Sequence, residues 1–305
     1  MPREAARRRR LTSAARPVAA AVAALGAGLA LWSPGLSPSR VLAEPAACPG
    51  VQVPPLALPG LRAQLAPRGG GGGFPRRAVA ATPPPPLTIV ALGSSSTAGA
   101  GASTPEATYP ARLEAILRAA RPDLSIRVVN RGRGGEQADQ MLARLDTEVL
   151  PERPALVIWQ VGANSALRHA DPARFQALVA TGIARLRAAG AEVVLMDNQR
   201  APRIEAAPGH ARFDALVADL ASGTPGVALF SRRRLMDAWA AAGTPPGAML
   251  DEDGLHHNDR GYACLAAALA EALLGGGGFG TAPAPPSIAA APAPVAARSA
   301  AAASR

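Results

Sequence analysis

Lysine is absent from the 305-residue sequence, so arginine supplies every basic side chain. Aromatic residues are scarce at 3%, although apolar residues as a whole reach 49%. Alanine, valine and leucine must therefore fill most of any core that the chain builds. The absence of lysine also excludes a Walker-type phosphate loop, because that motif needs a lysine after its second glycine.

The formal net charge of +10 is not carried by the central part of the chain. Residues 87–274 hold 19 Arg against 20 Asp and Glu, a net charge of −1. The excess lies in the two ends, chiefly in the six arginines within the first 16 residues. No aromatic side chains are interleaved with those arginines as a base-stacking surface requires. We therefore predict no nucleic-acid partner.

Long hydrophobic runs are missing as well. The best candidate, residues 17–32, is alanine-rich and falls short of the roughly 20 strongly apolar residues of a membrane-spanning helix. Its arginine-rich start and the small residues of Val41-Leu42-Ala43 are typical of a secretory signal peptide. We predict a signal peptide over residues 1–43 and a periplasmic or secreted protein without stable membrane insertion. An uncleaved N-terminal anchor is the alternative.

Only two cysteines are present, Cys48 and Cys264. In an oxidising compartment two thiols of a mature chain can form one disulfide bond, which would join the N-terminal arm to the last helical segment. Two unrelated thiols are the alternative. Two cysteines without supporting histidines do not make a metal site, so no metal is expected there.

Proline and glycine divide the rest of the chain into three parts. Residues 44–86 are expected to form an arm and linker with a short helix near 61–66, and residues 275–305 a low-complexity tail. Residues 87–274 alternate strand-like runs with helical periodicity. The strands are expected at 87–92, 125–130, 155–161, 191–197 and 226–230, and the helices near 108–120, 137–149, 172–189, 211–222, 231–242 and 259–274. This alternation predicts a parallel sheet covered by helices on both faces.

Polar and glycine-rich stretches follow several of these strands, where ligands bind in open α/β sheets. The first strand is followed by GSSSTAG (93–99), the second by NRGRGGE (130–136) and the third by GANS (162–165). None of them completes a dinucleotide loop, which needs G-x-G-x-x-G. The first stretch also lacks the second glycine of a G-x-S-x-G nucleophile elbow, because Thr97 stands there.

A serine nucleophile without an elbow remains, and it needs a base that a third group orients. Of the four histidines, only His256 has an aspartate, Asp253, at short spacing within a turn-rich stretch. His169 and His210 are expected to be solvated, and His257 to point away from His256. Gly135 and Asn164 follow the second and third strands. There, a backbone N–H and an amide NH₂ can stabilise an oxyanion at the same edge.

These blocks, in their order along the chain, resemble the SGNH hydrolases, also called GDSL-type esterases or lipases. The resemblance rests on residues 92–99, 130–135, 161–164 and 253–256, and it covers residues 87–274. It implies a three-layer α/β/α sandwich, flavodoxin-like, with a parallel five-stranded sheet in the order 2-1-3-4-5.

The resemblance also implies a serine esterase that needs no cofactor and no metal. Ser95 would be the nucleophile, and Asp253 and His256 would complete a catalytic triad. The N–H of Ser95 would form the oxyanion hole with Gly135 and Asn164. The substrate would be a small-molecule or glycan ester with a short acyl or acetyl group; no substrate-binding residue follows from the sequence.

Two positions depart from the family pattern. Ser94 stands where the first block usually has Asp, and Ser165 where the third block usually has a second acid. Because neither acid is a triad member in the family, altered support of the loops is expected rather than lost chemistry. The alternatives are an acyltransferase acting on an envelope polysaccharide by the same triad, and a catalytically inactive SGNH-fold binding module.

Overall fold

The computed structural model describes residues 47–66 and 85–275. The predicted signal peptide at 1–43, residues 44–46 and 67–84 of the predicted arm and linker, and all but the first residue of the predicted tail lie outside the described residues. Across the two described ranges, no helix is both long enough and apolar enough to cross a membrane.

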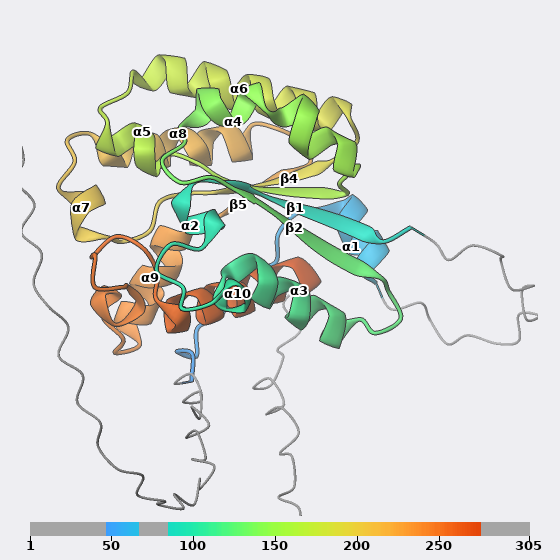
Figure 1. The fold of residues 1–305 in the computed structure, drawn as a ribbon, viewed down its shortest axis with the longest axis horizontal. Helices are drawn as coiled ribbons and strands as arrows, with labels where there is room; N and C mark the ends of the chain where they lie inside the picture. The colour runs from blue at the N-terminus through green and yellow to red at the C-terminus, as the bar shows by residue number, and fades with distance from the viewer. Residues whose placement is uncertain (1–46, 67–84, 276–305) are drawn as a thin grey trace, which may run out of the picture. The chain divides into compact units, whose positions relative to one another are not determined.

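A five-stranded parallel sheet forms the centre of the fold (Figure 1), in the strand order β2-β1-β3-β4-β5. This is the predicted order. The strands are β1 (Leu87–Gly93), β2 (Ile126–Gly132), β3 (Leu156–Gln160), β4 (Glu192–Met196) and β5 (Val227–Phe230). The carboxyl ends of β1 and β2 are level, since Gly93 pairs with Gly132, and this edge receives the loops that the sequence singled out.

Helices cover both faces of the sheet, as predicted (Figure 1). One face packs on α1 (Pro59–Leu65), α3 (Tyr109–Ala120), α9 (Arg232–Ala241) and α10 (Asp259–Leu274); the other packs on α4 (Ala138–Ala143), α6 (Pro172–Ala188) and α8 (His210–Ser222). Side chains of a strand alternate between the two faces. Ile89 and Ile158 therefore join the first core, while Val90 and Val157 join the second.

Short helical elements complete the connections. They are α2 (Ser95–Ala98), α5 (Ala163–Leu167), α7 (Pro202–Glu205), η1 (Pro105–Ala107), η2 (Leu145–Val149), η3 (Leu150–Glu152) and η4 (Pro246–Met249). The helix expected over 137–149 is interrupted, because α4 ends at Ala143 and η2 is a π-helical turn.

The N-terminal arm is part of the domain where the structure describes it, which differs from the expectation of a linker. Leu56, Leu58, Leu61 and Leu65 are buried in the core below the sheet. The Glu192 carboxylate at the start of β4 accepts hydrogen bonds from the first turn of α1, at 2.7 Å from the Leu61 N–H. In the sequence these leucines stand in a proline-rich stretch, which gave no indication that they are buried.

A disulfide bond joins Cys48 to Cys264, which confirms the predicted pairing. The two Cα atoms are 5.3 Å apart, and 216 residues separate the cysteines in the chain. Cys264 is buried in α10, so the bond fixes the beginning of the arm to the last helix. The Leu56 N–H donates to the Ala272 carbonyl at 3.0 Å and secures the arm a second time.

Replacing both Cys48 and Cys264 by alanine is expected to lower the free energy of unfolding by about 2–5 kcal/mol, because the loop that the bond closes is long. Guanidinium unfolding of the oxidised parent and of the double variant measures this difference. Titration of thiols in the denatured, unreduced parent is the control. Two free thiols there would contradict the pairing.

Candidate active site

Ser95 is the first residue of α2, directly beyond the carboxyl end of β1. Gly93 and Gly132 let the backbone of α2 approach the ends of β1 and β2 closely. A Cβ on Gly93 would lie 2.2 Å from the Thr97 Oγ1, and a Cβ on Gly132 would lie 2.1 Å from the backbone nitrogen of Ala98. The short helix therefore sits directly on the ends of β1 and β2, and this holds Ser95 at the edge of the sheet.

The neighbouring serines have other surroundings. Ser94 is buried, and both its N–H and its hydroxyl donate to the Gln160 Oε1, at 2.9 and 3.0 Å. The Thr97 hydroxyl donates to the same oxygen at 3.3 Å. Gln160, the last residue of β3, thus anchors the loop through Ser94. Ser94 is the residue that stands where the family pattern has Asp. Ser96 is also buried.

A tight loop between η4 and α10 carries Asp253 and His256. Leu250 and His257 form an antiparallel bridge, and the Asp251 N–H donates to the His256 carbonyl at 2.8 Å. Gly254 has a φ of 63°, a left-handed conformation that glycine adopts without strain. The loop therefore reverses direction, which brings the side chains of Asp253 and His256 together.

Ser95, His256 and Asp253 form a continuous hydrogen-bonded chain. The Ser95 Oγ lies 2.7 Å from the His256 Nε2, and the His256 Nδ1 lies 2.5 Å from the Asp253 Oδ2. The other carboxylate oxygen accepts the backbone N–H of Leu255 at 2.8 Å and that of His256 at 2.9 Å. The three residues that the sequence singled out thus lie in contact.

The charge state of Asp253 fixes the tautomer of the imidazole. Partial burial raises the pKa of the Asp253 carboxyl, but hydrogen bonds from the backbone and side chain of His256 and from the Leu255 N–H outweigh it. The pKa therefore lies below its ordinary value. An ionised carboxylate only accepts hydrogen bonds, so the proton of a neutral His256 is on Nδ1. Its Nε2 lone pair then faces the Ser95 hydroxyl.

The other histidines do not join this chain. His257 is fully buried, its Nδ1 lies 3.0 Å from the Met249 carbonyl, and its ring packs edge-on against Tyr262. Burial, followed by the nearby Arg232 guanidinium, lowers the pKa of His257 to about 3. His169 is exposed, and the His210 Nδ1 lies 3.1 Å from the Ala207 carbonyl.

Gly135 and Asn164 lie beside each other. Gly135 has a φ of 78° in the turn that follows β2. The Asn164 Nδ2 donates to the carbonyl of the next residue, Glu136, at 2.9 Å. An amide nitrogen carries two protons, so this bond orients the side chain and leaves the second proton for a ligand. The Ser95 N–H lies in the first turn of α2, where backbone donors have no partner within the helix.

Arg144, which the sequence did not indicate, supports the Gly135 turn from below. It is buried where α4 gives way to η2. Its guanidinium contacts the Glu136 carboxylate at 2.8 Å and the Arg131 carbonyl at 2.6 Å. The buried Arg144 therefore connects the end of β2 with the turn that presents Gly135, and it stands at the point where the predicted helix is interrupted.

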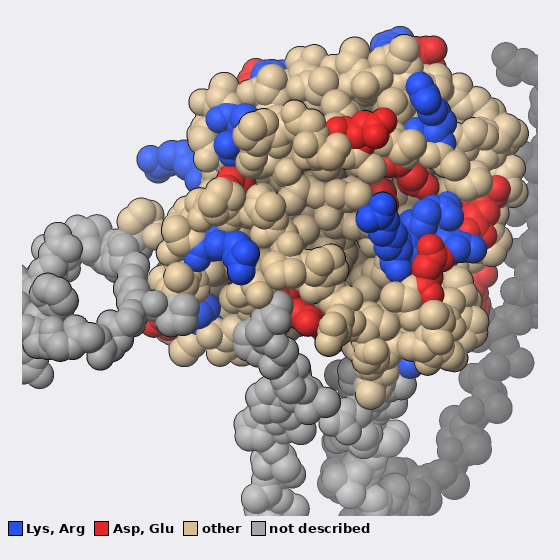
Figure 2. Space-filling view, turned by 180° about the vertical axis from the view of Figure 1, so that it is seen from behind, with Lys and Arg blue, Asp and Glu red and all other residues tan. Residues whose placement is uncertain are grey.

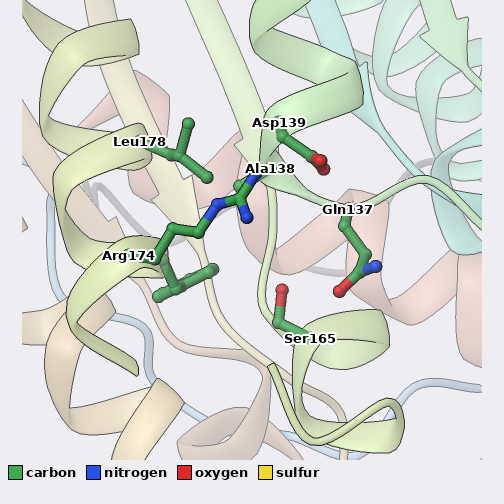
Figure 3. Close-up of a pocket in the computed structure, with 7 residues that line it drawn as sticks. Gln137, Ala138, Asp139, Ser165, Arg174 and Leu178 are labelled. Carbon is green, nitrogen blue, oxygen red and sulfur yellow. The ribbon is translucent and has the colours of Figure 1, made fainter. Parts of the chain in front are cut away.

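Two hollows lie near these loops, and neither is lined by a triad residue. A pocket of about 130 Å³ lies behind Gln137 and Ser165, and Arg174 reaches into it from α6 (Figure 3). Ser165 is buried and stands where the family pattern has an acid. A larger groove of about 560 Å³ runs between α2 and α3, lined by small residues such as Ala98 and Gly99.

Several charged side chains elsewhere on the surface form local ion pairs. Figure 2 shows arginines and acids interspersed on the face turned away from the viewer in Figure 1. Arg200, which follows β4, is engaged by both Glu205 and Asp237. In the part of the chain that the structure describes, no group of three His, Cys, Asp or Glu residues is placed to hold a metal ion.

Residues 70–277, more than half of the chain, match the model of a family described as the non-GDSL lipase-like family. The chain belongs to this family. The match extends over the sheet, all of its helices except α1, and all four blocks of the candidate site. It confirms the predicted relationship to the SGNH hydrolases.

The chain is also similar to proteins named as esterases. This lipase-like chain is 35% identical to the esterase TesA of Pseudomonas aeruginosa over 115 residues, which span 38% of this chain and 56% of that esterase. A crystal structure of TesA is similar with a TM-score of 0.50 and 28% identity, over 61% of this chain and 97% of that one.

The acetylxylan esterase Axe2 of Geobacillus stearothermophilus has the same fold. Its TM-score is 0.52 at 20% identity, over 61% of this chain and 94% of that chain. At this identity the likeness concerns the fold alone.

Proposed function

We propose that this protein is a serine esterase that hydrolyses carboxylic esters through Ser95, His256 and Asp253. The observation that carries the proposal is the hydrogen-bonded chain from Ser95 through His256 to Asp253, at the carboxyl edge of the sheet. The esterase names of its relatives support the same reaction class.

In the first half of the reaction, the Ser95 Oγ attacks the ester carbonyl carbon and its proton passes to the His256 Nε2. Asp253 stabilises the imidazolium that forms. The C–O bond to the alcohol then breaks, and His256 gives the proton to the leaving oxygen. This leaves an acyl group on Ser95.

In the second half, His256 takes a proton from water as the water oxygen attacks the acyl carbon. The bond to the Ser95 Oγ breaks, Ser95 regains its proton and the carboxylic acid leaves. The protein atoms return to their starting state, so the residues present supply every proton transfer.

Negative charge develops on the carbonyl oxygen in both halves. We assign its stabilisation to the N–H groups of Ser95 and Gly135 and to the second amide proton of Asn164. Asn164→Ala is therefore expected to lower kcat by about 10²–10³-fold with little change in KM, because the donor acts mainly in the transition state. Steady-state kinetics on a short-chain ester measures both constants. A variant that raised KM alone would contradict this role.

We propose short acyl groups as substrates. The support is the small size of the residues that follow the nucleophile, which leave little apolar surface for a long chain. Hydrolysis of p-nitrophenyl acetate by the purified protein tests the reaction class. Comparison with the butyrate and octanoate esters tests the acyl preference. Protein that is folded by circular dichroism but cleaves none of the three would favour a binding module instead.

We further propose that the protein acts in the periplasm or outside the cell. The disulfide bond supports this, because such bonds persist in oxidising compartments. The mature protein is expected to begin at Glu44. N-terminal sequencing of protein from the cell envelope and the medium checks this; a chain that still begins near Met1 would favour the uncleaved anchor.

A further inference from the structure

Arg168 lies beside two of the proposed oxyanion donors, Asn164 and Gly135. Asn164 and Arg168 are four residues apart on α5 and its C-cap, so they lie on the same face of one short helix. The Arg168 N–H donates to the Asn164 carbonyl at 3.0 Å, and the Ala170 N–H to the Ser165 carbonyl at 2.9 Å. These bonds fix the backbone from which Arg168 extends.

The Arg168 guanidinium reaches the turn that presents Gly135. Its Nη2 lies 3.2 Å from the position that a Cβ on Gly135 would occupy. That position and the Gly135 nitrogen are bonded to the same Cα, so the guanidinium lies within about 6 Å of this nitrogen. A substrate carbonyl oxygen that accepts a hydrogen bond from the Gly135 N–H therefore lies near the guanidinium.

No acidic side chain neutralises Arg168 within the described ranges. The acid next to Gly135 in the chain, Glu136, is turned inward and paired with Arg144 at 2.8 Å. Asp171 instead caps α6, accepting the Arg174 N–H at 2.6 Å. Arg168 is exposed, so its charge faces solvent at the rim of the site.

The proposed mechanism indicates which part of a substrate lies near the Arg168 guanidinium. His256 protonates the leaving alcohol, so the alcohol lies on the His256 side of the reacting carbon. The carbonyl oxygen points to the Gly135 and Asn164 donors, and the acyl chain leaves the same carbon on the side away from the alcohol. A chain that folds alongside the carbonyl oxygen would bring an anion, two to four bonds beyond the carbonyl, toward Arg168.

We propose that Arg168 is a specificity-determining residue that recognises a carboxylate on the acyl group, so that half-esters of short dicarboxylic acids are preferred substrates. A planar guanidinium fits a carboxylate with two parallel hydrogen bonds, which an ammonium group cannot do. The inference rests on the esterase function proposed above and specifies the substrate class of that site.

The test compares two esters of the same length. Monomethyl glutarate carries the carboxylate, and dimethyl glutarate is its neutral counterpart; methanol release is followed by NMR. Arg168→Gln is expected to lower kcat/KM for monomethyl glutarate about three- to tenfold, as for one exposed charge-assisted contact, and to leave the neutral ester within twofold. Arg168→Lys should recover only part of the preference.

Arg62→Gln is the charge-matched control. Arg62 is exposed on α1, which docks at the opposite edge of the sheet through Glu192, so its loss should leave both esters unaffected. An equal fall for both esters in Arg168→Gln, or no fall for either, would overturn the proposal. So would a preference for 3-acetoxypropanoate, which carries its carboxylate on the alcohol side.

The same measurements distinguish a failure of the esterase function from a failure of the role of Arg168. If the parent hydrolyses neither ester nor p-nitrophenyl acetate, the esterase function itself fails. If the parent hydrolyses them and the ratio of the two kcat/KM values is the same in Arg168→Gln, only the role of Arg168 fails.

Discussion

Ser95→Ala is expected to lower kcat for ester hydrolysis by about 10⁴-fold or more. The Ser95 Oγ is the atom held 2.7 Å from the His256 Nε2, and no acyl-enzyme can form without it. The alanine variant should fold like the parent, because only one partly exposed oxygen is lost. Steady-state kinetics with p-nitrophenyl acetate, at high enzyme concentration for the variant, measures the loss.

The adjacent serines are matched controls. Ser96→Ala should keep most of the activity, because its side chain is buried away from the imidazole. Ser94→Ala removes one of the hydrogen bonds to Gln160 and should cost stability more than catalysis. If either of them destroyed activity while Ser95→Ala did not, the assignment of the nucleophile would be wrong.

His256→Ala is expected to lower kcat as severely as Ser95→Ala, and the double variant should be no worse than either single one. Residues of a triad act as a unit, so their losses do not add. Asp253→Asn should be severe but less so, because the carboxylate is partly exposed and water can replace part of its support. A double variant that lost the product of the two single effects would contradict a shared proton-transfer chain.

His257→Gln is the control for this prediction. The spacing alone suggests a mild effect for loss of His257, but the ring is fully buried and packs against Tyr262. Truncation to alanine would therefore leave a cavity and cost about 2–4 kcal/mol of stability. Glutamine keeps most of the volume and a donor for the Met249 carbonyl. It should leave kcat within about threefold and lower the midpoint of unfolding.

The parallel sheet and the candidate residues Ser95, Asp253 and His256 could be predicted because they depend on local patterns, whereas the strand order followed from the resemblance to the SGNH hydrolases. Near-continuous apolar strands imply a parallel sheet, and parallel strands bring their carboxyl ends to one edge. The order of four short blocks along the chain then selected one family. The buried Ser94 has an acceptor in place of the usual acid's contacts, because its N–H and hydroxyl both donate to Gln160.

Other features could not be predicted because they depend on contacts between distant residues. Gln160 ends a strand and looks like any polar strand end. Arg144 lies within an apparently continuous helix, and only the fold shows that its guanidinium joins Glu136 to the end of β2. The leucines of the arm stand next to Pro54, Pro55 and Pro59 in a proline-rich stretch, which indicates a linker. Their burial depends on the core that the folded domain provides, which includes residues of α10.

Covalent labelling tests the central claim most directly. The purified protein is treated with a fluorophosphonate, which reacts with activated serines, and the labelled peptide is identified by mass spectrometry. We expect one phosphonyl group on Ser95, with labelling much slower in His256→Ala and unchanged in His257→Gln. A label on Ser94 or Ser96, or a folded parent that takes no label while it hydrolyses esters, would contradict the assignment of Ser95 as the nucleophile.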